Sequence, residues 1–291
     1  MTDDVRFSVL RRKLLAGLGA AAIGGVMASA VGRAAPAPAQ ESERGAVVPT
    51  ILAFEVNDSL LDIRHLAPLF ERLFGDGKLV NEWYTQLILH SEAITLAGGP
   101  YIPFFNLSEA VLKWMGSIHG VSIQQADIVE LGRRSATMPA HSDVPAGLKQ
   151  LKDAGFRLVT LSNSPQGVQI AQLGHAGIDG FFERLLSVDL VRRFKPAPQV
   201  YHMAAEELFV STAAICMVST HVWDNLGAQN VGCPAALIAR PGNAPSPALA
   251  VPGWPSPAVV GPDLPSVAAQ LRDLRGTSYA SRDGIDCRYN D

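Results

Sequence analysis

Cysteine is scarce in this sequence. Its 291 residues include three cysteines, Cys216, Cys233 and Cys287, at wide spacings. No CxxC pair and no zinc-like pairing of Cys with His occurs. Neither a disulfide framework nor a zinc site is therefore expected, and the thiols should be buried or free.

Charge is also scarce, and its two signs nearly cancel. Lys and Arg number 24 against 27 Asp and Glu, which leaves a formal net charge of -3, and no basic stripe follows the N-terminus. Phosphate binding needs clustered Lys and Arg, so we expect no nucleic-acid partner. With 48% hydrophobic and 18% charged residues, the composition is that of a soluble globular protein and excludes disorder throughout.

The N-terminal segment departs from this composition. Three basic residues, Arg11 to Lys13, precede an uncharged run at 14–31, and small residues at A-x-A spacing follow. This plan is typical of an export signal, and the paired arginines resemble a twin-arginine signal. We expect residues 1–40 to be a signal peptide, cleaved after Ala30 or Ala39, and the protein to be periplasmic. An uncleaved membrane anchor is the alternative, because the uncharged run nearly suffices to span a bilayer; no other membrane contact is expected.

From residue 47 onward, short apolar runs alternate with amphipathic stretches, which is typical of a parallel sheet flanked by helices. The predicted strands lie within residues 47–56, 156–163, 181–188, 213–220 and 235–240. The predicted helices of this part are residues 145–155, 164–177, 198–209, 221–232 and 264–274.

A purely helical stretch interrupts the alternation after the first strand. Apolar residues recur there at spacings of three and four, and Ser108 is expected to cap the last of its helices. The helices are predicted at residues 65–75, 82–98 and 107–120, with no strand between 64 and 141. The sequence therefore predicts an α/β core at 47–63 and 144–276, a helical cap at 64–143, and a disordered polar tail at 277–291.

Polar side chains gather where the predicted strands end. They are Glu55, Asn57 and Ser59, then Ser162 and Asn163, then Lys195, and finally Ser219, His221 and Asp224. Ligands of open parallel sheets bind at this edge. The set combines a carboxylate placed to attack, hydroxyls and an amide that can hold an anion, a lysine, and a second acid that can orient groups or activate water.

Each of these residues also has a purely structural explanation. Glu55 could be a solvated loop residue, and Lys195 could lie in a surface turn before a proline. Ser162 could cap the next helix, and Asp224 could favour a helix dipole. Their recurrence at one sheet edge in successive units favours a shared site.

Four segments carry a resemblance to a known family. FEVNDSLLD, LVTLSNSP, SVDLVRRFKPAPQVY and MVSTHVWDNLGA, in this order, resemble the haloacid dehalogenase superfamily, and within it the type II 2-haloacid dehalogenases. The resemblance covers about residues 47–274. It implies a Rossmann-like parallel sheet with a helical cap inserted after the first strand.

The resemblance also implies a mechanism. In that family an aspartate after the first strand displaces halide from the substrate's α-carbon, and water activated by a late acid and a lysine hydrolyses the ester. Glu55 stands at the position of this aspartate, His221 replaces a common Asn, and Tyr84 occupies the place of an Arg that serves the leaving halide.

By the same resemblance, Glu55, Lys195, Asp224 and Ser219 would be catalytic, and Ser59, Asn57, Tyr84, Ser162, Asn163, Tyr201 and His221 would bind substrate. Ser162 and Asn163 would hold its carboxylate. No metal or organic cofactor is implied; the expected partner is a small 2-haloacid, and a homodimer is possible because family members are often dimers.

Two alternatives to a 2-haloacid dehalogenase follow from the substitutions. A carboxylate at Glu55 reaches about 1.5 Å farther than an aspartate would, and a misplacement near 1 Å can slow displacement about a hundredfold. A catalytically impaired binding protein for small carboxylates is therefore one alternative. A phosphatase is the other and the less favoured, because Asn57 cannot donate an acidic proton and Asp224 is a single acid where magnesium prefers more carboxylate oxygens.

Overall fold

The computed structural model describes residues 49–240, 253 and 255–282. The chain divides into two units, Met1–Arg44 and Gly45–Asp291, and the described residues all belong to the second. The predicted signal peptide at 1–40 and the last residues of the predicted tail lie outside the described residues. Within the described residues, no helix combines the length and apolarity needed to cross a membrane.

A six-stranded parallel sheet forms the centre of the fold, with strand order β3-β2-β1-β4-β5-β6. Its strands are β1 (Ile51–Phe54), β2 (Arg157–Ser162), β3 (Arg184–Ser187), β4 (Ile215–Ser219), β5 (Ala235–Ile238) and β6 (Val259–Gly261). Every residue of β1 and β4 is buried, as expected for apolar strands covered on both faces. The chain adds strands first on one side of β1 and then on the other, so β1 and β4 flank the switch point where ligands bind in such sheets.

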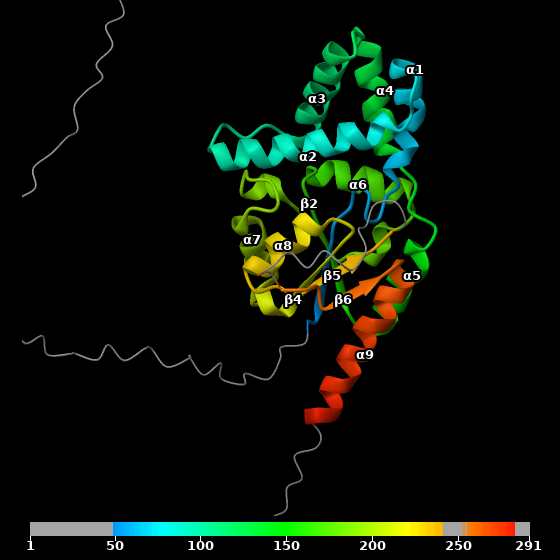
Figure 1. Ribbon diagram of the computed structural model, residues 1–291. Helices are drawn as coiled ribbons and strands as arrows, with labels where there is room; N and C mark the ends of the chain where they lie inside the picture. The colour runs from blue at the N-terminus through cyan, green and yellow to red at the C-terminus, as the bar shows by residue number, and fades with distance from the viewer. Residues whose placement is uncertain (1–48, 241–252, 254, 283–291) are drawn as a thin grey trace, which may run out of the picture. The chain divides into compact units, whose positions relative to one another are not determined.

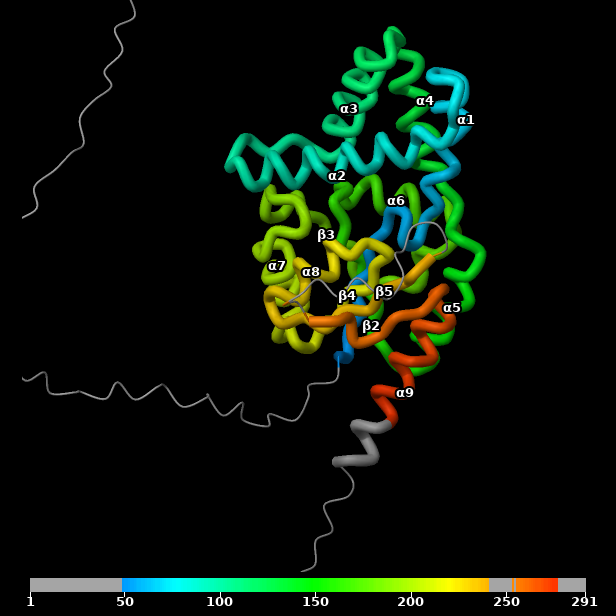
Figure 2. The backbone as a smooth tube through the Cα atoms, in the orientation of Figure 1, coloured from blue at the N-terminus to red at the C-terminus, as the bar shows by residue number. Residues whose placement is uncertain are grey.

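Five helices of the described residues accompany the sheet. They are α5 (Val144–Asp153), α6 (Gln166–His175), α7 (Pro198–Leu208), α8 (Val222–Asn230) and α9 (Leu264–Arg282), with short 3-10 turns η2 (Asp179–Phe181), η3 (Val188–Leu190) and η4 (Thr212–Ala214). Helix α5 packs against α9, and Figure 2 shows these distant segments of the chain side by side. Helix α7 packs against α8, which brings the segments after β3 and β4 together.

The cap consists of η1 (Ile63–Leu66), α1 (Ala67–Phe74), α2 (Leu79–Ala97), α3 (Phe104–Ile118) and α4 (Gln125–Ala136). All of these lie between β1 and β2 in the chain, and Figure 1 shows them gathered on one side of the sheet. Helix α4 contacts α6 of the core. The α/β fold with a helical cap after the first strand is thus confirmed.

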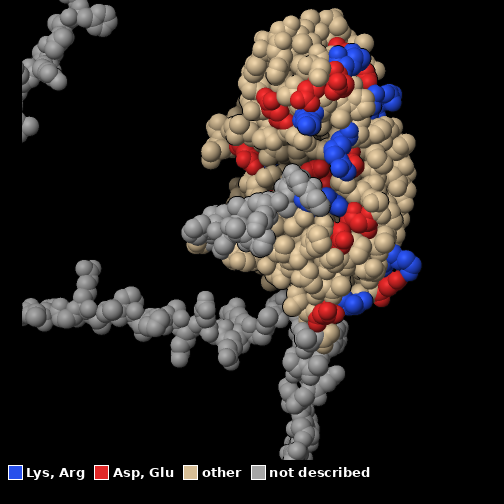
Figure 3. Space-filling view, turned by 45° about the vertical axis from the view of Figure 1, so that its right-hand side comes forward, with Lys and Arg blue, Asp and Glu red and all other residues tan. Residues whose placement is uncertain are grey.

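Charges of both signs lie intermixed over the cap on the face that Figure 3 shows. Arg72 of α1 pairs with two acids of α4, Asp127 at 2.8 Å and Glu130 at 2.7 Å. These pairs join the first and last helices of the cap.

The structure differs from the expected elements in four places. Helix α4 was not expected, because its mean hydropathy is low, although a capping box between Gln124 and Asp127 marks its start. The prediction that Ser108 caps α3 is wrong: the helix begins at Phe104, and the Ser108 hydroxyl donates to the Phe105 carbonyl at 2.6 Å. Strand β6 was missed because its three residues follow a stretch rich in proline and alanine. Helix α9 continues to Arg282, so residues 277–282 are helical where a disordered tail was expected.

Candidate active site

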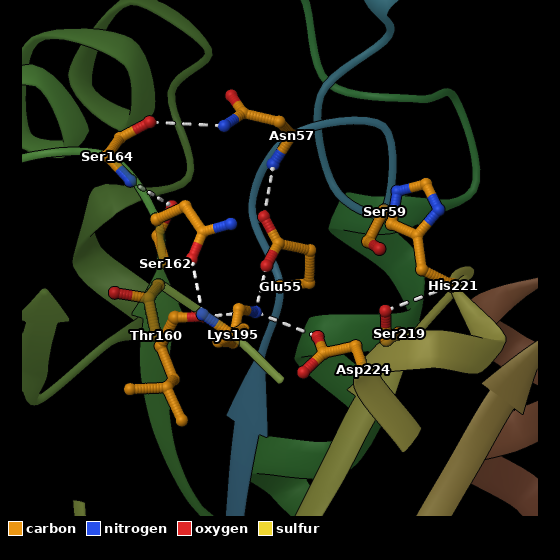
Figure 4. A network of polar contacts seen from close by, with 12 residues as sticks. Glu55, Asn57, Ser59, Thr160, Ser162, Ser164, Lys195, Ser219, His221 and Asp224 are labelled. Atoms are coloured by element: carbon orange, nitrogen blue, oxygen red, sulfur yellow. Dashed lines mark hydrogen bonds and ion pairs between the residues drawn. The ribbon is translucent and has the colours of Figure 1, made fainter. Parts of the chain in front are cut away.

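The Lys195 ammonium is the centre of a buried charged group. Its Nζ donates to a Glu55 carboxylate oxygen, to Asp224 Oδ2 at 2.8 Å and to the Leu161 carbonyl at 2.8 Å (Figure 4). Lys195 and Asp224 are fully buried, and Glu55 is 1% exposed. Glu55 follows β1, Lys195 lies in the loop between β3 and α7, and Asp224 lies in the first turn of α8, which follows β4. This edge of the sheet thus brings together the three charged residues predicted there. We call Glu55, Lys195, Asp224 and Tyr201 the Lys195 cluster.

Burial and charge act in opposite directions on the pKa values in this cluster. Burial raises the pKa of Glu55; the Lys195 charge opposes that rise and Asp224 adds to it. Burial by itself would lower the pKa of Lys195, but Asp224 and Glu55 together raise it above its ordinary value. The ammonium is therefore held in its charged form between two carboxylates.

Both oxygens of Asp224 have side-chain donors. Lys195 donates to Oδ2, and the Tyr201 hydroxyl donates to Oδ1 at 2.8 Å, with the Asp224 carbonyl at 3.0 Å from the same hydroxyl. This contact requires close packing of α7 and α8, because a Cβ at Gly227 would lie 2.6 Å from the Tyr201 hydroxyl. Tyr201 and Asp224 thus position Lys195, which in turn contacts Glu55.

The main chain orients the Glu55 carboxylate. The Glu55 amide donates to the Val218 carbonyl at 3.1 Å, which extends the β1–β4 pairing by one residue. The Asn57 amide donates to Glu55 Oε1 at 3.2 Å. One carboxylate oxygen therefore accepts from Lys195 and the other from a backbone N–H, which fixes the orientation of the group.

Ser162 and Asn163 hold the loop after β2. Ser162 Oγ accepts from the Ser164 amide at 3.1 Å, and Asn163 Oδ1 accepts from the Lys195 amide at 3.0 Å. Both side chains are acceptors in these bonds, so their donor groups can serve an anionic ligand. Their predicted role as carboxylate ligands remains a prediction.

Ser59 and Ser219 hold the loop after β4. Ser59 Oγ accepts from the Thr220 amide at 2.9 Å and lies 3.1 Å from the Thr220 hydroxyl. Ser219 Oγ accepts from the His221 amide at 3.0 Å. These contacts fix the position of His221 relative to the loop after β1.

The His221 imidazole lies in an aromatic group. Its ring stacks on Trp223 with a centroid distance of 5.2 Å and lies 5.6 Å from the Tyr84 ring. Nε2 is 3.8 Å from Asp58 Oδ2 and has no hydrogen-bond partner among the described residues. Burial, and then the charge of Lys195, lowers the pKa of His221 to about 4, so the ring is neutral near pH 7.

Tyr84 of α2 connects the cap to the site. Its hydroxyl lies 3.5 Å from the Asn57 carbonyl, a long hydrogen bond. Burial raises the pKa of Tyr84 well above its ordinary value, and the neighbouring carboxylates reinforce this shift. The Tyr84 side chain is therefore a neutral phenol near pH 7; its match to the family's halide-binding arginine remains a prediction.

A small cavity of about 50 Å³ lies between cap and core, with room for a few water molecules. No lining residue is charged. The cap contributes mainly apolar side chains, and the core contributes Asn57, Ser164, Pro165, Val168 and Gln172. Of the predicted site residues, Asn57 and Tyr84 line it, while the Lys195 cluster does not. Asn57 Nδ2 donates to the Ser164 hydroxyl at 3.1 Å, and the backbone N–H of Asn57 donates to Glu55. Asn57 therefore connects the cavity to Glu55.

Four residues of the site were not singled out by sequence reasoning. They are Thr220, Trp223, Ser164 and Gln172. Thr220 and Trp223 lie within MVSTHVWDNLGA, and Ser164 lies within LSNSP, so the strand-end argument extended by one or two residues would have included these three. Gln172 lies in α6, and no local pattern distinguishes it.

Comparison with known proteins agrees with this fold. A family model for haloacid dehalogenase-like hydrolases matches residues 77–232. The (S)-2-haloacid dehalogenase of Pseudomonas sp. (strain YL) is 30% identical over 205 residues, covering 70% of this chain and 88% of the relative. Haloacetate dehalogenase H-2 of Moraxella sp. (strain B) is 27% identical, covering 66% and 87%. The crystal structure of the L-2-haloacid dehalogenase RSc1362 superposes with a TM-score of 0.71 at 29% identity, covering 77% of this chain and 99% of that one. The chain therefore belongs to the haloacid dehalogenase-like hydrolases.

Proposed function

We propose that this hydrolase displaces halide from a small 2-halocarboxylic acid, with the Glu55 carboxylate as nucleophile. The observation that carries the proposal is the Lys195 cluster, in which a buried ammonium and a backbone N–H hold a carboxylate at the switch point of the sheet. The similarity to (S)-2-haloacid dehalogenases supports the substrate class.

The first step needs no proton donor. A Glu55 oxygen forms a bond to the α-carbon, the carbon–halogen bond breaks, and the halide leaves with the bonding electrons. The Lys195 charge opposes the burial that raises the pKa of Glu55 and so favours its ionised form, and the donor groups of Ser162 and Asn163 are proposed to hold the substrate carboxylate. The rest of the substrate would occupy the neutral cavity beside Asn57 and Tyr84.

In the second step, water attacks the carbonyl carbon of the Glu55 ester. The products are a 2-hydroxy acid and the free Glu55 carboxylate. Ser59 and Ser219 act through the loop that carries His221, which they hold in place. Tyr201 acts through the Asp224 carboxylate, to which it donates a hydrogen bond.

Chloride release from 2-chloropropionate tests the proposal directly. We expect turnover by the purified chain and none by Glu55→Ala. In ¹⁸O-water, label should enter the Glu55 side chain after repeated turnover, which intact-mass and peptide analysis detect. Turnover without label in Glu55 would contradict nucleophilic attack by this residue.

A binding function without turnover is the second candidate. Its support is that both Glu55 oxygens already accept hydrogen bonds and that the side chain is 1% exposed. It predicts that small carboxylic acids raise the melting temperature while no halide is released. Chloride release above the Glu55→Ala background would dismiss it.

A metal-dependent phosphatase fits the residues less well. Asn57 replaces the acid that would protonate a leaving alcohol, and the described residues contain no group of three or more Asp, Glu, His or Cys arranged to hold a metal. Cleavage of an aryl phosphate that depends on added Mg²⁺ would reverse this conclusion.

Export is proposed on the N-terminal sequence alone. Fractionation of cells that produce the full chain tests it: a shortened protein in the periplasm is expected. Recovery at full length in the cytoplasmic fraction would contradict export, and recovery in membranes would favour an anchor.

A further inference from the structure

Asp224 is poorly placed to activate the water of the second step. Lys195 donates to its Oδ2 and Tyr201 to its Oδ1, and the side chain is fully buried. Each Asp224 oxygen retains a second lone pair, but both oxygens already accept a hydrogen bond within a fully buried group, so a water has little access to them. The acid that the family resemblance assigns to water activation is thus occupied with positioning Lys195.

His221 is placed differently. Its Nε2 is buried and has no hydrogen-bond partner among the described residues, and Asp58 Oδ2 lies 3.8 Å away. A neutral imidazole has one nitrogen that accepts a proton. The Asp58 carboxylate would stabilise the imidazolium that forms when it does.

The fold places this ring next to Glu55. His221 follows β4 and Glu55 follows β1, and these strands are hydrogen-bonded neighbours. Trp223 stacks on His221 and its ring lies 5.7 Å from Lys195 Nζ, so one indole ring borders both the imidazole and the Lys195 cluster. Figure 4 shows His221 and Ser164 on opposite sides of Glu55.

We propose that His221 is the general base that activates water to hydrolyse the Glu55 ester, with Asp58 supporting its charged form. This inference rests on the proposed function. The water oxygen bonds to the ester carbonyl carbon while one of its protons passes to the imidazole. The bond from that carbon to the substrate oxygen then breaks, and the departing alkoxide takes the proton from the imidazolium. The other water proton is lost to solvent from the regenerated Glu55 carboxyl group.

A single-turnover experiment with 2-chloropropionate tests the assignment. His221→Asn and His221→Gln should each release about one equivalent of chloride and then stall, with steady turnover lowered about a hundredfold or more. Intact mass should show the ester accumulating on the protein, and peptide mapping should place it on Glu55. His202→Asn is the matched control, because His202 is exposed on α7, and it should turn over like the unmodified chain.

Asp224→Asn should behave in the opposite way. Because Asp224 holds Lys195, this variant should fail to release even the first equivalent of chloride and should accumulate little ester. If Asp224→Asn accumulates ester while both His221 variants turn over normally, the assignment of His221 is overturned. If the unmodified chain releases no chloride, the proposed function itself fails, and the inference fails with it. Two His221 variants are used because one of them could fail to fold, which its melting temperature would reveal. The other variant then decides the result.

Discussion

The Lys195 cluster and the cavity between cap and core meet at Asn57, yet they are built in opposite ways. The cluster is charged and buried, and Lys195 in it donates to Glu55 after β1, to Leu161 of β2 and to Asp224 of α8. The cavity is lined by uncharged and mostly apolar side chains, many of them from the cap. In the proposed function the core would provide the groups that react, and the cap would provide a neutral space whose shape selects what reaches them.

The largest effect that separates the two regions is expected from Lys195→Met. The substitution leaves Glu55 and Asp224 buried without their cation, so we expect turnover to be lost and unfolding free energy to fall by about 3–5 kcal/mol in urea titrations. Lys149→Met is the control, since the Lys149–Asp153 pair is largely exposed and should change stability by less than about 1 kcal/mol. Equal losses for the two variants would show that the cluster is not a special charged site.

Glu55→Asp tests how closely the cluster is fitted to its own nucleophile. The shorter side chain withdraws the carboxylate by about 1.5 Å from Lys195 and the Asn57 amide. We expect kcat for 2-chloropropionate to fall about a hundredfold. A rise in kcat would mean that the site still suits the family's aspartate and that Glu55 is an impairment.

Tyr201→Phe removes a donor from a buried carboxylate. We expect a loss of about 1.5–3 kcal/mol in unfolding free energy, because Asp224 Oδ1 would lose its hydrogen bond. Tyr101→Phe is the comparison: Tyr101 also donates to a carboxylate, that of Asp189, but both residues are only partly buried. A larger loss for Tyr101→Phe would contradict the importance assigned to burial.

The smallest effect is expected on the cavity side, from Tyr84→Phe. The hydroxyl makes a 3.5 Å contact with the Asn57 carbonyl, so its removal should cost less than about 1 kcal/mol of stability. If Tyr84 contributes to substrate binding only through the packing of its ring, KM should change less than threefold. A collapse of kcat with unchanged stability would instead give the phenol a role in the chemistry.

The two regions also differ in how far the sequence predicts them. Glu55, Lys195 and Asp224 could be placed together because each follows an apolar run, and parallel strands end at one edge of a sheet. Tyr201 entered the predicted site only through the family resemblance, because it is one residue among several in a helix. Its pairing with Asp224 was not predicted. Helix α4 was missed because most of its surface is polar, and β6 because three residues carry too little pattern.

The cavity could not be derived from sequence patterns at all. Trp83, Leu87 and Phe104 line it, but their spacing in α2 and α3 is also that of residues that pack only within the cap. Which apolar side chains face an open space depends on how the cap helices sit on the loops after β1 and β2. His221 shows the same limit, because its free Nε2 and its distance from Asp58 are properties of the assembled fold.

The central place of β1 has a consequence for how the chain reaches its native state. The strand pairs with β2 and β4, whose residues follow it by more than a hundred positions, and Glu55 meets Lys195 across 140 residues of chain. During synthesis the apolar β1 emerges long before either neighbour, a situation that exposes a strand to aggregation. Formation of the Lys195 cluster is therefore a late event, and the proposed dehalogenase activity would report completion of folding through at least Asp224.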